Sequence, residues 1–155
     1  MIWDHKLQTI VMLTKPVEAG TPKCAIYWPE KVNETLVLKP SLHVRMTYLQ
    51  YFADFDMRVF EVTDPLQTSE VPLEVKHFFF TSWPDHGVPQ FATALISFIK
   101  KVRKNYSSNG PPMVVYCSAG VGRSGTYITL DTMLQRMAVT QDVNVYEFVH
   151  NMCMK

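Results

Sequence analysis

The residues best suited to chemistry lie together in one stretch, from Val114 to Gly125, which reads VVYCSAGVGRSG. A short β-branched run leads into Cys117, small residues follow it, and the pattern then becomes helical. Small residues let successive backbone N–H groups converge on one point, and the helix behind them adds the positive end of its dipole. We therefore expect a cradle for a dianion such as phosphate, with Cys117 on its floor.

Arg123 follows Cys117 after five intervening residues and can place two parallel donors on two phosphate oxygens. The same positive field favours thiolate over thiol, so Cys117 can act as a nucleophile near neutral pH. A lone cysteine is more often a buried apolar residue, which is our interpretation of Cys24 and Cys153. At Cys117 the preceding strand, the glycines, the arginine, the Ser124 hydroxyl and the helix start together favour an anion site.

This stretch resembles the signature loop of the cysteine-dependent protein tyrosine phosphatases, which reads histidine, cysteine, five residues, arginine, serine or threonine, and glycine. It differs at one position, since Tyr116 stands where the family has histidine. The resemblance implies that Cys117 takes the phosphoryl group, that Arg123 clamps it and that Ser124 hydrogen-bonds the thiolate when the phosphocysteine breaks down. First-turn helix capping is the alternative role of Ser124. The implied phosphate-binding residues are Ser118, Ala119, Gly120, Val121, Gly122 and Arg123.

A second motif, WPDHGVP, runs from Trp83 to Pro89. An aspartate on a mobile loop can protonate a departing oxygen and later accept a proton from attacking water. Pro84 and Gly87 restrict and hinge such a loop, and Trp83 can anchor it. A Pro-Asp pair alone would indicate an ordinary turn, but the whole motif resembles the general-acid loop of the same family. That resemblance implies that Asp85 is the general acid and base.

The resemblance covers the whole chain, and it implies supporting roles for Glu18 and Lys23 in holding the arginine and the acid loop. As bare residues these two would be surface charges. Family domains are longer at both ends: the phosphotyrosine loop upstream and the glutamine-bearing loop downstream have no counterpart here. This implies one partial domain over 1–155 and a phosphoenzyme that forms faster than it hydrolyses. Tyr116 cannot become a cation, so we expect a higher pKa for Cys117 than in the family.

Apolar periodicity and turn residues predict the elements that carry these motifs. The predicted strands are 9–13, 35–39, 43–49, 57–62, 73–80 and a central strand at 114–116. The predicted helices are 91–105 with an apolar face at 92, 95, 96, 99 and 102, a helix from the cysteine loop to about Met137, and a last helix after Asn144. Met1 to Trp3 look like the end of a helix. Such a mixture indicates an α/β fold, a central mixed twisted sheet flanked by helices.

The 155 residues suit one domain, since 47% are apolar and 19% charged. A net charge of +1 disfavours a nucleic-acid or membrane-surface partner. Three cysteines make no disulfide framework or zinc pattern, and a reactive thiol needs reducing surroundings. The polar N-terminus is unlike a signal peptide, and no apolar run reaches membrane-spanning length. We expect a cytoplasmic monomer with no membrane segment, no cofactor and no metal.

Three interpretations follow for function. The favoured one is a protein tyrosine phosphatase that hydrolyses phosphotyrosine through a phosphocysteine intermediate, impaired by Tyr116 and the missing loops. The second is a catalytically weak or dead phosphatase-like module that binds and shields phosphotyrosine-containing proteins, because binding needs the cradle and the arginine but not a fast nucleophile. The third is a chain with too little sheet to fold stably, which a cooperative melting transition would exclude.

Overall fold

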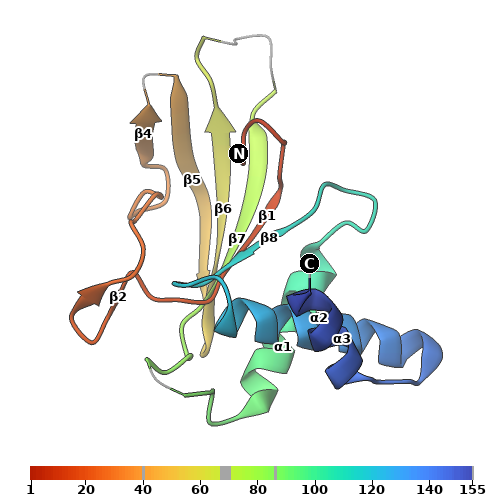
Figure 1. Cartoon of the computed structure of the whole chain (residues 1–155). Helices are drawn as coiled ribbons and strands as arrows, with labels where there is room; N and C mark the ends of the chain where they lie inside the picture. The colour runs from red at the N-terminus through yellow and green to blue at the C-terminus, as the bar shows by residue number, and fades with distance from the viewer. Residues whose placement is uncertain (40, 67–70, 86, 155) are drawn as a thin grey trace.

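The computed structural model describes residues 1–39, 41–66, 71–85 and 87–154, which form an α/β fold (Figure 1). The main sheet has six strands: β1 (Thr9–Met12), β4 (Thr35–Lys39), β5 (Leu42–Tyr51), β6 (Phe55–Thr63), β7 (Leu73–Phe80) and β8 (Val114–Tyr116). A hairpin of β2 (Val17–Glu18) and β3 (Thr21–Pro22) stands apart from it. The helices are α1 (Ala92–Asn105), α2 (Gly122–Thr140) and α3 (Val145–Cys153).

The sheet is mixed, with strand order β4-β5-β6-β7-β1-β8. Neighbouring strands from β4 to β7 are antiparallel, whereas β1 pairs in parallel with both β7 and β8. In the last pairing Met12 lies opposite Tyr116. Parallel strands end at the same edge of a sheet, and ligands of open α/β sheets bind at that edge. The loops that follow β1 and β8 therefore start side by side.

The expectation that 114–116 form a central strand was wrong. Among the described strands β8 ends the sheet, and β1 separates it from β7. All four residues of β1 are buried, whereas the three of β8 are only half-buried. The apolar run of β8 looks central in the sequence because Val115 packs against the core beneath the helices, not because strands flank it on both sides.

The helices gather on one side of the sheet (Figure 1). The core between the two layers joins sheet residues such as Val11 and Phe78 to Phe98 of α1 and Tyr127 of α2. The buried face of α1 consists of Leu95, Phe98, Ile99 and Val102. The predicted face was wrong at Ala92, which is exposed, and it missed Phe98, which is fully buried.

The opposite face of the sheet has its own apolar cluster, in which Ile10, Met46, Phe60 and Val75 pack with Trp28. Loops rather than helices cover it. The predicted helix end at the N-terminus is a set of turns over 2–6, in which the N–H groups of Leu7 and Lys6 donate to the carbonyls of Ile2 and Trp3 at 3.0 and 3.1 Å. This is the hydrogen-bond pattern that ends a helix.

The last helix begins as predicted at Asn144, whose side-chain oxygen accepts the N–H of Glu147 at 3.0 Å. The Glu147 carboxylate accepts from the Asn144 side-chain amide, also at 3.0 Å, and not from the Asn144 backbone N–H, so only half of a capping box is present. The preceding helix α2 continues past the predicted Met137 to Thr140 and ends at Gln141, with a positive φ of 56°. In the described part of the chain, no helix has the length and apolarity to span a membrane.

Candidate active site

Strand β8 delivers Cys117 to a loop that leads directly into α2, as predicted. Gly120 takes a φ of 75°, which glycine adopts without strain. Val121 begins the helix and makes no side-chain hydrogen bond to the first turn. The N–H groups of that turn are therefore available to another acceptor. Residues 118–122 are exposed, so a ligand can reach this acceptor position from solvent.

The sulfur of Cys117 lies where those N–H groups point. Partial burial alone would raise the pKa of the thiol. The Ser124 hydroxyl and the N–H groups of Ser124, Gly120 and Arg123 lie close enough to the sulfur to favour its charged form, and together they hold the pKa of Cys117 below the ordinary value. Ser124 is buried, and no group in the described residues forms a geometrically complete hydrogen bond with its hydroxyl. The hydroxyl is not a side-chain cap of α2.

Glu18 orients Arg123 at the other end of the loop. The guanidinium donates to both carboxylate oxygens, with Nη1–Oε1 at 2.5 Å and Nη2–Oε2 at 3.0 Å. The hydrogen bond from Arg123 holds the pKa of Glu18 below its ordinary value, and Thr14 Oγ1 and the Lys15 N–H add further hydrogen bonds at 3.1 Å. Because Glu18 is only 4% exposed, the pair is a shielded bidentate contact rather than a surface ion pair.

The acid loop lies against the same guanidinium. Arg123 Nη2 donates to the carbonyls of Pro84 and Asp85 at 3.2 and 3.3 Å, and the guanidinium carbon is 5.8 Å from the Trp83 ring centre. Buried Trp83 donates from Nε1 to the Gly87 carbonyl at 3.2 Å, which ties the two ends of the loop together. The structure therefore brings the two motifs together. Residue 86 of the motif lies outside the described residues.

Two of the predicted groups have no protein partner among the described residues. The Asp85 carboxylate, which is partly exposed, has no hydrogen bond or ion pair within the described ranges, and the same holds for Nε of Arg123. These are the groups that an incoming phosphate ester would need. The remaining protein contacts of Arg123 fix its plane.

Lys23 and Tyr116 do not join this arrangement through their side chains. Lys23 is exposed, and its ammonium contacts no acidic group in the described part of the chain. The Tyr116 hydroxyl lies on the sheet face away from the helices, 2.8 Å from the hydroxyl of Tyr27 and 3.9 Å from the sulfur of Cys24. It makes no direct bond to Cys117.

One further participant is a backbone segment. The N–H of Leu13 donates to the Tyr116 carbonyl at 3.0 Å, and the Leu13 carbonyl accepts from Arg123 Nη1 at 3.1 Å. Leu13 thus links the residue before the cysteine to the arginine at the end of the loop. Such a role leaves no trace in side-chain type, so only the expected parallel pairing of the two strands could have indicated it.

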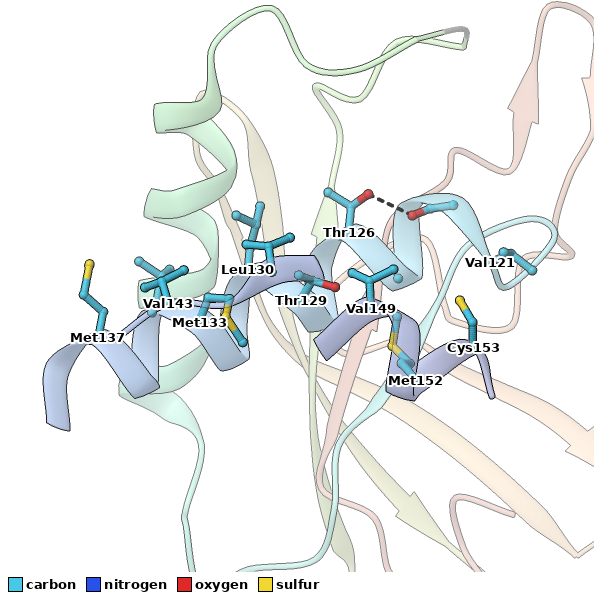
Figure 2. Close-up of a pocket in the computed structure, with 14 residues that line it drawn as sticks. Val121, Thr126, Thr129, Leu130, Met133, Met137, Val143, Val149, Met152 and Cys153 are labelled. Atoms are coloured by element: carbon cyan, nitrogen blue, oxygen red, sulfur yellow. Dashed lines mark hydrogen bonds between the residues drawn. The ribbon is translucent and has the colours of Figure 1, made fainter. Parts of the chain in front are cut away.

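A groove of about 580 Å³ lies next to the site but outside it. Figure 2 shows it between α2 and α3, with Val121 at one end and Met137 at the other. Its lining is apolar and contains neither Cys117 nor Arg123. In the same view Thr126 donates to the Gly122 carbonyl at 2.9 Å, inside the first turn of α2. The groove and the cysteine loop therefore share the start of α2 as a common wall.

Comparison with known proteins agrees with this geometry. A family model described as protein-tyrosine phosphatase matches residues 1–155. Receptor-type tyrosine-protein phosphatase U of Gallus gallus is 37% identical over 153 residues, and receptor-type tyrosine-protein phosphatase F of Danio rerio is 38% identical over 155. The alignments cover 99% and 100% of this chain but 10% and 8% of those relatives. The chain belongs to the protein-tyrosine phosphatase family and spans a tenth or less of the length of these relatives.

Proposed function

We propose that this domain hydrolyses phosphotyrosine in proteins through a phosphocysteine intermediate. The observation that carries the proposal is the placement of Cys117: it stands before the exposed loop 118–122 that starts α2, and this loop ends at an arginine held by two hydrogen bonds to Glu18. The names of the related receptor-type tyrosine-protein phosphatases support the choice of substrate.

The proposed reaction has two steps. The Cys117 thiolate attacks phosphorus, the P–S bond forms and the bond to the tyrosine oxygen breaks, while Asp85 gives that oxygen its proton. The loop N–H groups and Arg123 bind the three non-bridging oxygens, on which the charge of a loose transition state is spread. Water then attacks the phosphocysteine, Asp85 accepts a proton from it, and Ser124 stabilises the departing thiolate. The scheme uses protein groups alone.

A second function rests on Tyr116. Its hydroxyl bonds Tyr27 on the far face of the sheet and contributes no bond to the sulfur. A phosphatase-like module that binds and shields phosphotyrosine proteins requires the cradle and the clamp but not a fast nucleophile. In either role the thiol requires a reducing compartment, and we propose that the domain works as a monomer on the cytoplasmic side.

The test compares turnover with binding on a phosphotyrosine peptide. We expect Cys117→Ser to abolish turnover but still to bind the peptide. We expect Asp85→Asn to slow turnover by roughly 10²- to 10⁴-fold, the range of general acid catalysis. Asp142→Asn, a carboxylate 67% exposed beyond the end of α2, is the matched control and should keep the parental rate. If the parent protein binds the peptide but turns it over no faster than Cys117→Ser, the proposed enzyme is wrong and the binding module is the better interpretation.

A further inference from the structure

A pair of tyrosine hydroxyls lies beneath the cysteine loop, on the sheet face away from the helices. Tyr27 and Tyr116 place their hydroxyl oxygens 2.8 Å apart, although 89 positions separate them in the chain. The Tyr27 ring packs edge-on against Trp28, with 4.8 Å between ring centres, and against His77 at 5.8 Å. Rings on two sides therefore hold the Tyr27 hydroxyl in place.

The groups that face the pair leave it neutral. Burial raises the pKa of both phenols far above the ordinary tyrosine value. His77 is fully buried, and burial lowers its pKa to about 3, so it carries no charge near neutral pH. Arg58 forms an ion pair with Asp56 at 2.8 Å, and Cys24 approaches Tyr116 only at 3.9 Å. The contact is a hydrogen bond between two uncharged hydroxyls, one of which donates.

Tyr116 is therefore fixed at two points. Its backbone carbonyl accepts the Leu13 N–H at 3.0 Å, and its side chain is held by Tyr27. The next residue is Cys117. Because the two residues share a peptide plane, the orientation of Tyr116 sets the position of the sulfur relative to the N–H groups of the loop. The hydrogen bond from Tyr27 thus influences the position of the Cys117 sulfur from the opposite face of the sheet.

We propose that Tyr27 is a positioning residue for the cysteine loop, which acts through the Tyr116 hydroxyl to hold Cys117 within its ring of donors. The proposal rests on the function given above, in which Cys117 is the nucleophile. Neither neighbour can substitute for Tyr27: the Cys24 thiol is a weak partner at a long distance, and His77 has no hydrogen bond to either tyrosine in the described structure. A phenylalanine at either position leaves the other hydroxyl, which is half-buried, without this hydrogen bond.

The experiment measures alkylation of Cys117 by iodoacetamide against pH, with the modified peptide quantified by mass spectrometry, so that Cys24 and Cys153 do not contribute. Tyr27→Phe, Tyr116→Phe and the double variant each lose the same bond, and Tyr51→Phe, at a residue 71% exposed, is the matched control. We expect each single variant to react roughly three- to tenfold more slowly at pH 7, because less thiolate is present. The double variant should be no slower than either single variant, since both remove one shared interaction.

Each other outcome has a defined meaning. A Tyr27→Phe curve that coincides with that of Tyr51→Phe overturns the proposal, and so do losses that add in the double variant. If only one of Tyr27→Phe and Tyr116→Phe melts cooperatively, that folded variant alone tests the hydrogen bond. If neither melts cooperatively, the pair is needed for folding and the proposal is wrong. Because alkylation of Cys117 needs no turnover, the experiment can contradict the positioning role of Tyr27 without contradicting the proposed function. A parent whose Cys117 titrates like an ordinary thiol contradicts the proposed function, whereas a reactive parent insensitive to Tyr27 contradicts only the positioning role.

Discussion

At the scale of single residues, the contact between Glu18 and Arg123 is the strongest polar interaction of the site. Both side chains are largely buried, at 4% and 15% exposed, and they share two hydrogen bonds. A shielded bidentate pair favours one plane for the guanidinium. If Arg123 clamps the phosphate as proposed, the substrate would meet an arginine that is already oriented, and little of its binding energy would be spent on ordering it.

This contact makes stability depend on pH. The pKa of Glu18 lies lower in the folded chain than its ordinary value of 4.5, so its charge stabilises the fold above that value and the contribution is lost as pH falls through the folded pKa. We expect Glu18→Gln to lower the free energy of unfolding at pH 7 by about 2 kcal/mol. Chemical denaturation from pH 7 to pH 3 should show this difference shrinking. Glu61→Gln, in a surface pair with Arg45, is the control, and an equal loss there would contradict the account.

The residue before the nucleophile provides a second test at this scale. We expect Tyr116→His to lower the pKa of Cys117 and speed phosphoryl uptake, because an imidazolium beside the loop favours thiolate. Alkylation of Cys117 against pH measures the change in the variant and the parent. Superimposable curves would show that the identity of residue 116 has no influence on the thiol.

At the scale of elements, three parts meet around one point: the end of β1, the loop after β8 and the acid loop after β7. Cys117 stands shortly before the start of α2, and no side chain caps that helix. In the proposed function, anion binding and the start of the helix would therefore be one arrangement. A phosphate bound there would add its charge to the favourable end of the same helix.

The helices differ in how firmly they are held. Helix α2 buries Tyr127 and Met133, but α3 has no buried residue, and its Val145 and Tyr146 are 50% and 81% exposed. We expect the amide hydrogens of 145–153 to exchange much faster than those in the middle of α2, because local opening of α3 exposes little apolar surface. Hydrogen exchange followed by mass spectrometry measures both. Equal protection of the two helices would contradict this ranking.

Local patterns predicted elements better than they predicted partners. Strands 35–39, 73–80 and 114–116 match because β-branched or aromatic runs end at clear breakers. The edge position of β8 was missed because strand order depends on long-range pairing. The face of α1 was shifted by Ala92, whose small side chain is exposed in the first turn.

In the candidate site, too, local motifs were predicted better than contacts between distant residues. Contiguous motifs indicated Cys117, Arg123 and Asp85, and the structure brings their segments together. The bond between Tyr27 and Tyr116 could not be found from spacing, because it joins residues on different elements. Leu13 acts through its peptide group alone, so any residue type could fill its role. The part assigned to Lys23 remains a prediction.

At the scale of the whole molecule, one feature of topology organises the site: β1 and β8 are parallel neighbours, and their ends face the start of α2. The chain carries a net charge of only +1, so the attraction for a phosphate dianion comes from the loop and Arg123 rather than from the overall field. The proposed chemistry is therefore local: Cys117 forms a bond to phosphorus, and the loop around it makes this possible.

A rapid-mixing experiment with an aryl phosphate tests that claim most directly, on protein first shown to melt cooperatively and with Cys117→Ser as the blank. Phosphocysteine formation releases one leaving group per protein before water regenerates the thiol. We expect an initial burst near one equivalent of released phenol, followed by a slower steady rate. Release no greater than that of the blank, from a folded chain, would contradict it.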